Sequence, residues 1–293
     1  MNNYCEGGVA VPRYPKSVRY YREYTDDFLG SGERGKLKFD YGRDRRAGFR
    51  IGSFILYRLI ATPIAFIHSA LFLRQRVVGR DRLRAYCRSV KRAKSGSLPA
   101  GETCIGATGT LLVCNHCERV GDAFTPSVVA FPRRTHVVVH PDNLTLPVLG
   151  RLTALLGAIP VPQDIRSARD FSRSLCDKLG RGHAVAIYPE AHLWEKYTAI
   201  RPFADSALDP AVRCGAPVFA CTRVYLRRPV VGYVTRLYID GPFYPDQALT
   251  RSAACRDLAA RVRAKMQERA KESNVEVIKY IKEENPEGQG TAE

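Results

Sequence analysis

A histidine and an aspartate stand at the end of an apolar run near the middle of the chain. The run 111–114 leads directly into Asn115 and His116, and Asp122 follows just before a second apolar segment. A carboxylate beside an imidazole fixes the tautomer of the ring and stabilises the imidazolium, so the pair can act as a general base. Because the chain contains no Gly-x-Ser-x-Gly motif, we expect His116 to take its proton from a substrate hydroxyl.

Two alternatives stay open for this pair. Glu118 is closer to His116 in the sequence, although a residue so near in the same loop usually points elsewhere. Asp122 also suits the first turn of a helix, where a carboxylate can cap the backbone without taking part in chemistry. Five residues separate the histidine from the aspartate. Gly121 predicts a bulge in this loop, because glycine reaches backbone conformations closed to other residues.

A second group of polar residues follows the apolar run 184–188. Pro189 and Glu190 end that run, and Arg201 lies further along the chain. A carboxylate at the mouth of a buried strand is costly unless it has a partner. Arg201, or a phosphate-bearing substrate ordered by several arginines, would provide that partner.

The nine cysteines show no spacing typical of a disulfide framework, and the N-terminus has no apolar signal sequence. The sequence therefore predicts free thiols in a reducing cytoplasm. Cys114 and Cys117 form a Cys-x-x-Cys pair, but zinc would need a second pair at similar spacing, and Cys214 and Cys221 are too far apart. We interpret the two thiols as side chains that fill space beside a strand end, and we predict no metal site.

From residue 110 onward, short β-rich apolar runs alternate with helical segments. Apolar strands bounded by helices are typical of a largely parallel sheet covered on both faces. The pattern predicts a mixed α/β fold with strands at 110–115, 135–139, 157–161, 184–188, 217–225 and 232–239, and helices at 122–131, 146–156 and 168–179. A long charged helix is expected over 252–284.

Composition divides the chain into four parts. We predict a basic lead over 1–50, a membrane-interface helix with a basic flank over 51–94, the α/β domain over 95–250, and a charged C-terminal helix and tail over 251–293.

The segment 51–73 is the most apolar of the chain and is long enough to span a bilayer. On a helix, Arg58, Thr62, Ala65 and Ser69 would form a small or polar stripe. Basic residues flank both ends, whereas a spanning helix usually has them on one side. We therefore expect an interfacial helix or a re-entrant hairpin, with a buried core helix as the alternative.

The chain carries 46 Lys and Arg against 29 Asp and Glu, a net charge of +17. Such a surplus indicates a polyanionic partner: nucleic acid, an anionic membrane or an acidic carrier protein. No RNP block, zinc-finger spacing or helix-turn-helix signature is present, so we do not expect nucleic acid. A non-catalytic binder of anionic lipid or nucleic acid is the rival interpretation, but it leaves the placed His, Asp and Glu unexplained.

Four blocks, in this order, resemble the PlsC family of glycerolipid acyltransferases. They are Asn115-His116 with Asp122, Gly157-Ala158-Ile159-Pro160-Val161-Pro162, Tyr188-Pro189-Glu190, and Gly215-Ala216-Pro217-Val218. The resemblance covers about residues 53–244. The chain departs from the family pattern in three places. The family usually has four residues between His and Asp, an arginine where this chain has Gln163, and a Lys-x-Gly after Arg-Pro-Phe, where this chain reads Ala204-Asp205-Ser206.

The resemblance implies an activity and the residues for it. His116, oriented by Asp122, would deprotonate the free hydroxyl of a lysophospholipid such as 1-acylglycerol-3-phosphate, which would attack the thioester of acyl-CoA or acyl carrier protein without a metal or redox cofactor. The residues expected to bind substrate are Glu190, Arg201, Arg166, Gly157 and Pro160, with Arg166 or Arg169 replacing the missing arginine. The enzyme would sit on the cytoplasmic face of the cell membrane, as a peripheral or monotopic protein held by anionic lipid.

Overall fold

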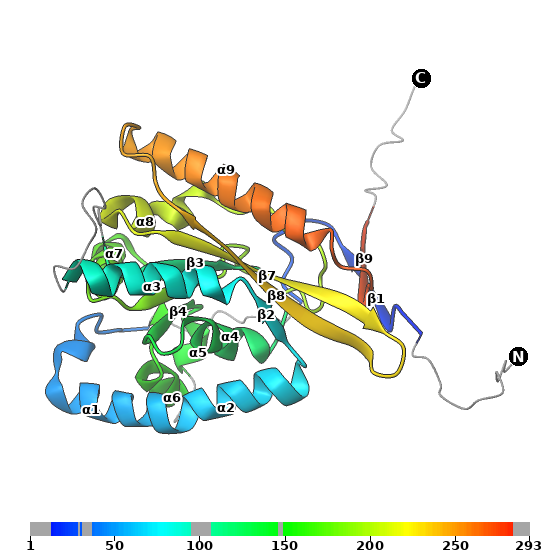
Figure 1. Ribbon diagram of the computed structural model, residues 1–293, viewed down its shortest axis with the longest axis horizontal. Helices are drawn as coiled ribbons and strands as arrows, with labels where there is room; N and C mark the ends of the chain where they lie inside the picture. Colours follow the sequence, from blue (N-terminus) through cyan, green and yellow to red (C-terminus); the bar gives the residue numbers. More distant parts are fainter. Residues whose placement is uncertain (1–12, 29, 31–36, 95–106, 146–148, 284–293) are drawn as a thin grey trace, which may run out of the picture.

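A seven-stranded sheet forms the centre of the molecule (Figure 1). The computed structural model describes residues 13–28, 30, 37–94, 107–145 and 149–283. The strand order is β2-β8-β7-β3-β6-β4-β5. The strands are β2 Arg76–Val78, β3 Thr110–Cys114, β4 Thr135–Val139, β5 Ala158–Pro160, β6 Ala184–Ile187, β7 Val218–Arg228 and β8 Gly232–Phe243.

The sheet is mixed and largely parallel, which confirms the expected fold class. Strands β3 to β7 all run parallel to one another, whereas β8 returns antiparallel to β7 in a long hairpin and β2 runs parallel to β8. The six strands predicted from apolar runs are present, with ends that differ by at most four residues, and 135–139 matches at both ends. The short strand β2 was not predicted, because three residues give no period to detect.

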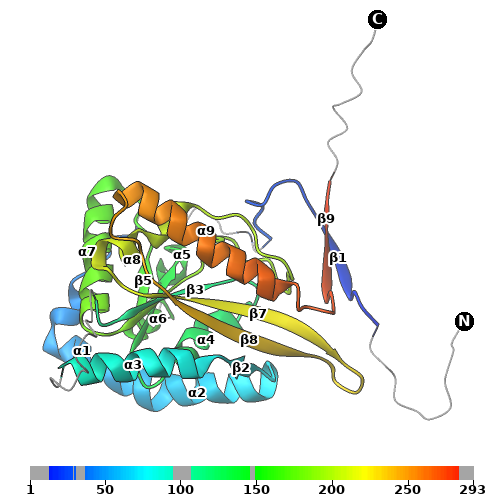
Figure 2. The same ribbon diagram turned by 45° about the horizontal axis from the view of Figure 1, so that its top comes forward.

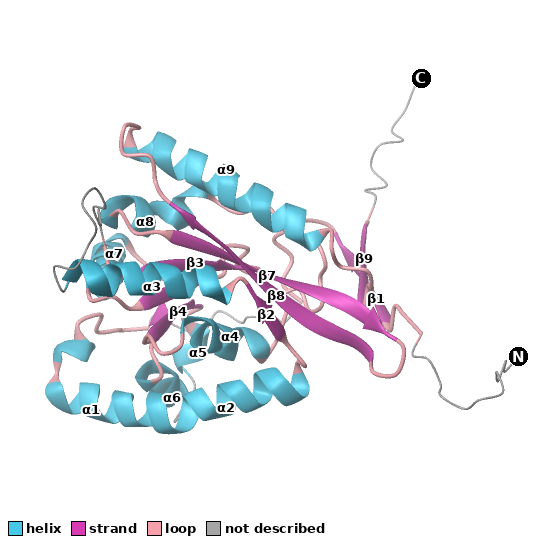
Figure 3. Cartoon of the chain, in the orientation of Figure 1, coloured by secondary structure: helices cyan, strands magenta, loops and turns pink. Residues whose placement is uncertain are grey.

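Helices cover both faces of this sheet (Figure 3). On one face, Leu111 and Val113 of β3 pack in a core with helices α7, α8 and α9, while Leu112 and Cys114 pack on the other face with α3 and α4. This alternation follows from the period of two along a strand. The helices are α3 Arg80–Lys94, α4 Gly121–Ala130, α5 Asp142–Thr145, α6 Leu149–Leu155, α7 Ile165–Gly180, α8 Asp209–Cys214 and α9 Arg251–Ala270.

The apolar segment before the sheet forms one continuous helix over Ala47–Phe72. It comprises α1 Ala47–Ile55, a π-helical part, α2 Thr62–Ile67 and a second π-helical part, and it lies along one side of the molecule (Figure 1). Among the described residues it is the one helix whose length and apolar composition would suit a bilayer.

The two faces of this helix differ sharply. The small and polar residues Ser53, Thr62, Ala65 and Ser69 are buried against the protein. The outward face is apolar, with side chains exposed by 48–76%: Ile51, Phe54, Ile55, Leu59, Ile60, Ile64, Ile67, Leu71 and Phe72. A buried core helix, the alternative considered from the sequence, is therefore wrong.

The two ends of the described chain meet in a second sheet. Strand β1, Ser17–Tyr21, pairs in parallel with β9, Ile278–Lys282, beside the end of the β7–β8 hairpin (Figure 2). The prediction of one helix over 252–284 is thus wrong after Ala270. The sequence from Val275 to Ile281 is rich in β-branched and aromatic residues, which favour a strand.

Two cysteines are paired, which corrects the expectation of free thiols. Cys176 of α7 and Cys214 at the end of α8 form a disulfide with a Cα–Cα distance of 6.0 Å. The sequence did not predict this disulfide, because two cysteines 38 residues apart are brought together only by the packing of α7 against α8. Cys114 and Cys117 are free and buried, as expected of space-filling side chains.

Candidate active site

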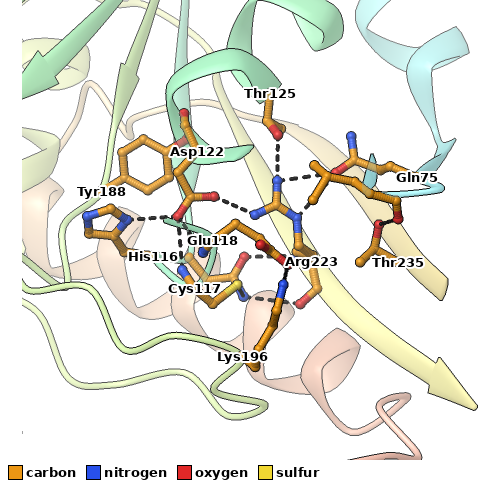
Figure 4. A network of polar contacts seen from close by, with 12 residues as sticks. Gln75, His116, Cys117, Glu118, Asp122, Thr125, Tyr188, Lys196, Arg223 and Thr235 are labelled. Carbon is orange, nitrogen blue, oxygen red and sulfur yellow. Dashed lines mark hydrogen bonds and ion pairs between the residues drawn. The ribbon is translucent and has the colours of Figure 1, made fainter. Parts of the chain in front are cut away.

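The loop after β3 brings His116 and Asp122 together (Figure 4). The Nδ1 atom of His116 lies 2.8 Å from Oδ2 of Asp122. Asp122 is buried, whereas the His116 side chain keeps 23% of its surface exposed. With Nδ1 taken by the carboxylate, Nε2 is the nitrogen left to receive a proton from a substrate.

The loop after β3 folds around the carboxylate of Asp122, and this accommodates the fifth residue between His116 and Asp122. The backbone amides of Cys117 and Glu118 each donate to Oδ2 of Asp122 at 3.0 Å. The predicted bulge at Gly121 is wrong, because Gly121 is the first residue of α4 and has no positive φ. A Cβ at this position would lie 2.8 Å from a methyl of Leu73 and 3.1 Å from the Cβ of Glu118, so a larger residue would require these side chains to shift.

Glu118, the alternative partner, points away from the histidine. Its carboxylate forms an ion pair with Lys196 and accepts a hydrogen bond from the Tyr225 hydroxyl at 3.2 Å. The structure therefore pairs His116 with Asp122 rather than with Glu118.

Arg223 of β7 is the residue of this site that sequence reasoning missed. Its guanidinium forms an ion pair with Oδ1 of Asp122 and also donates to Gln75 and Thr125 (Figure 4). The available signal was its position inside a strand that is otherwise buried and apolar, since a buried charge requires a partner. The identity of that partner depends on the pairing of β7 with β3, which no local pattern reveals.

Arg223 also sets the charge of Asp122. Burial alone would raise the pKa of this carboxyl group, but the charge of Arg223 and the hydrogen bond from His116 outweigh burial and lower it. Asp122 is therefore ionised at neutral pH and accepts the Nδ1 proton of His116. This leaves Nε2 as the basic nitrogen.

The neighbours of His116 favour a base rather than a nucleophile in the protein. Burial raises the pKa of the Cys117 thiol to about 12, so this sulfur is not a thiolate at neutral pH. The ring of Tyr188 lies 4.7 Å from the imidazole, and its hydroxyl donates to the carbonyl of Asp122 at 2.5 Å. Tyr188 thus braces the dyad from the end of β6.

A cavity of about 790 Å³ opens beside the dyad. Both His116 and Asp122 lie on its wall, and most of the remaining wall is apolar: Val137, Val138, Val161, Phe171, Leu175, Ile187 and Leu193. This volume is within the range of sites for ligands of moderate size. The apolar wall fits a hydrocarbon chain.

Three basic side chains share this wall. Arg213 pairs with Asp209 at 2.9 Å, and His140 lies 3.5 Å from Asp142. Arg119 is exposed, and within the described part of the chain it has no ion-pair partner. Arg119 is therefore the cation of this cavity that is free to bind an anion.

Glu190 and Arg201 form the expected ion pair, but away from the cavity. Their charged atoms are 3.1 Å apart, and both side chains are almost completely buried. Arg201 also donates to the backbone carbonyls of Tyr24 and His192. Burial raises the pKa of Glu190, and the charge of Arg201 together with a hydrogen bond from the His116 backbone opposes this rise. The geometry thus makes the pair a support of the His116 backbone, and it does not support direct contact with an acceptor.

The other predicted substrate residues also lie off the cavity wall. Gly157, before β5, has φ +105°, and a Cβ there would lie 2.9 Å from the carbonyl of Thr135. The carbonyl of the buried Pro160 accepts from the Tyr41 hydroxyl at 3.1 Å. Arg166 is exposed in the first turn of α7. Gly157 and Pro160 are placed to shape β5, and none of the three touches the dyad.

Both ends of the chain support the loop that carries Glu190. Trp194 is fully buried, and its Nε1 donates to the carbonyl of Asp26 at 2.9 Å. Its ring stacks on Tyr280 of β9 at 5.0 Å, and the Tyr280 hydroxyl donates to the carbonyl of Glu195. The lead before the helix and the final strand therefore fix this loop between them.

Replacing Glu190 by glutamine is expected to act mainly on stability. The change keeps the shape of the side chain but leaves the buried guanidinium of Arg201 without its counter-charge, which costs about 3–5 kcal/mol of unfolding free energy. Urea denaturation would measure this loss, with Glu195→Gln, a more exposed glutamate of the same loop, as the control. A raised acceptor KM with unchanged stability would instead restore Glu190 as a substrate ligand.

The site and the fold together define a class of protein: an α/β protein in which a histidine held by a carboxylate lies beside an apolar cavity. Residues 76–224 match the sequence model of the Acyltransferase family, and the chain belongs to that family. Among solved structures, it is similar to the 1-acyl-sn-glycerophosphate (LPA) acyltransferase PlsC from Thermotoga maritima. The two are 15% identical with a TM-score of 0.40, over 77% of this chain and 96% of that chain. No curated protein matches the chain.

Proposed function

We propose that this acyltransferase moves a fatty acyl chain from a thioester to the free hydroxyl of a lysophospholipid, with 1-acylglycerol-3-phosphate as the acceptor. The observation that carries the proposal is the His116–Asp122 dyad at the wall of a large apolar cavity. The family supports acyl transfer as the reaction. The cavity supports an acceptor with a hydrocarbon chain.

The reaction follows from the position of the dyad. Nε2 of His116 takes the proton of the acceptor hydroxyl as its oxygen attacks the thioester carbonyl. The tetrahedral intermediate then breaks its carbon–sulfur bond, and His116 returns the proton to the departing thiolate. Asp122, held ionised by Arg223, stabilises the imidazolium between the two steps. The donor is acyl-CoA or acyl carrier protein, and this sequence of steps consumes no metal or redox cofactor.

Arg119 is proposed to bind the phosphate of the acceptor. It follows His116 by three residues and lies on the wall of the same cavity. A guanidinium can hold two phosphate oxygens at once, which would orient the acceptor relative to the base. Arg119 therefore takes the role that the family resemblance led us to assign to Arg166.

Purified protein offered a panel of lysolipids with radiolabelled acyl-CoA and acyl carrier protein tests this function. We expect transfer to 1-acylglycerol-3-phosphate and much less transfer to lysophosphatidylcholine, whose phosphate is shielded by a choline group. An active protein that prefers another acceptor would retain acyl transfer but refute this substrate. A protein that binds the lipids and transfers nothing would favour the rival, a non-catalytic binder of anionic lipid.

The exposed apolar face of the helix Ala47–Phe72 is proposed to lie in the cytoplasmic surface of the membrane. Exposed arginines stand near both of its ends, Arg46 and Arg50 before the apolar stretch and Arg74 and Arg76 after it, where anionic headgroups would meet them. The protein would then be monotopic, with both flanks of the helix on the same side of the bilayer.

Serine at Phe54, Leu59 and Ile60 together should weaken binding to anionic vesicles at least about tenfold, because each side chain of this size contributes about 1 kcal/mol or more when it leaves water. Cosedimentation with vesicles measures the change. Serine at Val18, Val230 and Leu249, which are exposed elsewhere on the molecule, is the matched control. Equal binding by both triple variants would show that this helix is not the membrane contact.

A further inference from the structure

A second cavity, of about 640 Å³, lies at the opposite edge of the sheet from the dyad. It is lined by residues at the amino ends of parallel strands, including His136 in β4, Gly157 before β5 and His183 before β6. His116, in contrast, follows the carboxyl end of β3. The two cavities are therefore separate sites.

Basic groups outnumber acidic ones around this second cavity. Its lining holds five Lys or Arg side chains and two Asp: Arg43, Arg50, Arg134, Lys178 and Arg181 against Asp40 and Asp44. Asp44 is shared between Lys178 at 3.2 Å and Arg181 at 3.8 Å. Arg181 has a second partner in Asp177 at 3.0 Å, but the other three arginines of the lining have no carboxylate partner within the described residues, so the site as built has a surplus of positive charge.

Among the described residues, Arg43, Arg50 and Arg134 have no carboxylate partner, and Arg43 and Arg134 are partly buried. Arg134 donates only to Ser53 and to the carbonyl of Leu155, and it stacks on Tyr57 at 3.9 Å. Arg43 lies over the ring of Phe39 at 3.6 Å, and its buried NH2 atom has no hydrogen-bond partner. A buried donor without a partner is costly, so an anion that accepted this bond would stabilise the site.

The two histidines of this cavity do not add to its positive charge. His136 and His183 are joined through Nε2 and Nδ1 at 3.0 Å. Burial and, to a smaller extent, the nearby charge of Arg134 lower the pKa of His183 to about 4, and burial also lowers the pKa of His136. Both rings are neutral at physiological pH, so the cationic surplus rests on the lysine and the arginines.

The cavity reaches the membrane helix. Ile51 and Phe54 of α1 line it and are also exposed by 62% and 64% on the outward apolar face. A ligand seated among the arginines could therefore extend an apolar chain along α1 without leaving a hydrophobic surface. A free inorganic anion would make no use of this part of the wall.

From this arrangement we propose that the second cavity binds the phosphate group of an anionic membrane lipid, with one acyl chain lying along Ile51 and Phe54. The phosphate accepts hydrogen bonds from Arg43 and from the cations around Asp44. The lipid would hold α1 in place from the side opposite the dyad. The proposal does not depend on the acyl-transfer reaction, because the two sites share no residue.

Hydrogen exchange of the full chain with soluble short-chain lipids tests the proposal and separates the two sites. Dihexanoyl phosphatidate should slow exchange in residues 39–54 and 174–183. Inorganic phosphate and dihexanoyl phosphatidylcholine should do so only weakly. Protection around 116–124 in the same experiment would report the dyad cavity independently. Equal protection of 39–54 by inorganic phosphate would indicate a phosphate site rather than a lipid site and would overturn the proposal.

Two variants locate the binding. Arg43→Gln should raise the concentration of dihexanoyl phosphatidate needed to protect 39–54 by about tenfold or more, since a hydrogen bond to a charged group is lost. Ala47→Phe, which places a ring at the cavity wall, should weaken it as well. Arg88→Gln, an exposed arginine of α3, should change it by less than about twofold. If both cavity variants keep the protection of the unchanged protein, the lipid does not bind here.

Discussion

Alanine in place of His116 is expected to lower acyl transfer by about 10²–10⁴-fold while leaving the protein folded. The ring is partly exposed and contributes one hydrogen bond to the dyad, so its loss removes the base with little effect on the core. Asparagine in place of Asp122 should give a loss of similar size, because an amide cannot stabilise the imidazolium and can favour the wrong tautomer. Initial rates with saturating acceptor and donor would measure both effects.

His140→Ala provides the matched control for the histidine. His140 lies on the wall of the same cavity and is more exposed, but it pairs with Asp142 and is not part of the dyad. Its removal should leave the rate close to that of the unchanged protein. Full activity in Asp122→Asn, or equal losses in the two histidine variants, would refute the dyad as the catalytic base.

Methionine in place of Arg223 is expected to lower the unfolding free energy by about 3–5 kcal/mol at neutral pH. The change removes the guanidinium but keeps an apolar side chain of similar length, which leaves the buried carboxylate of Asp122 without its counter-charge. Urea denaturation would measure the effect. The double variant Arg223→Met with Asp122→Asn should recover much of the stability, because no buried charge remains, and it should stay inactive.

The loss of stability in Arg223→Met should be larger at neutral pH than at acidic pH. In the unchanged protein the pKa of Asp122 is lowered. Its ion pair therefore stabilises the fold at pH values above the pKa that Asp122 has in the unfolded chain, and this stabilisation is lost as the pH falls through the pKa of Asp122 in the folded protein. Without Arg223, burial should raise the pKa of Asp122, and the variant should gain stability as the pH falls through that raised value. The gap between the two proteins should therefore narrow from pH 7 toward about pH 4. A constant gap would mean that Arg223 acts through packing alone.

The strand ends that carry His116 and Glu190 could be predicted, because each follows a short apolar run rich in β-forming residues. Asp122 could be paired with His116 because only one short loop separates them. Arg223 could not be assigned to the dyad, since it reaches Asp122 through the pairing of two strands more than 100 residues apart. The same holds for β1 and β9, whose residues are 261 positions apart at the register Ser17 to Ile278.

The roles of Glu190 and Arg201 show a different limit of prediction from the sequence. The sequence correctly indicated that a carboxylate at the end of a buried strand needs a cation, and the two residues do form an ion pair. Whether such a pair faces a cavity or the interior depends on the packing around it. Here Tyr24 and His192 supply carbonyls to the guanidinium, and Trp194 lies 4.8 Å beneath it, so the pair is enclosed.

The stacking of Trp194 on Tyr280 has a consequence for how the protein is made. The loop that supports His116 is completed by β9, whose Tyr280 comes 85 positions after Glu195 of that loop, and β9 must leave the exit tunnel of the ribosome before it can pair with β1. The helix Ala47–Phe72, by contrast, precedes the loop in the chain and emerges well before β9. We therefore expect the exposed apolar face of this helix to be available before the loop that supports His116 is braced. Acyl transfer would then begin only once β9 has emerged and paired with β1.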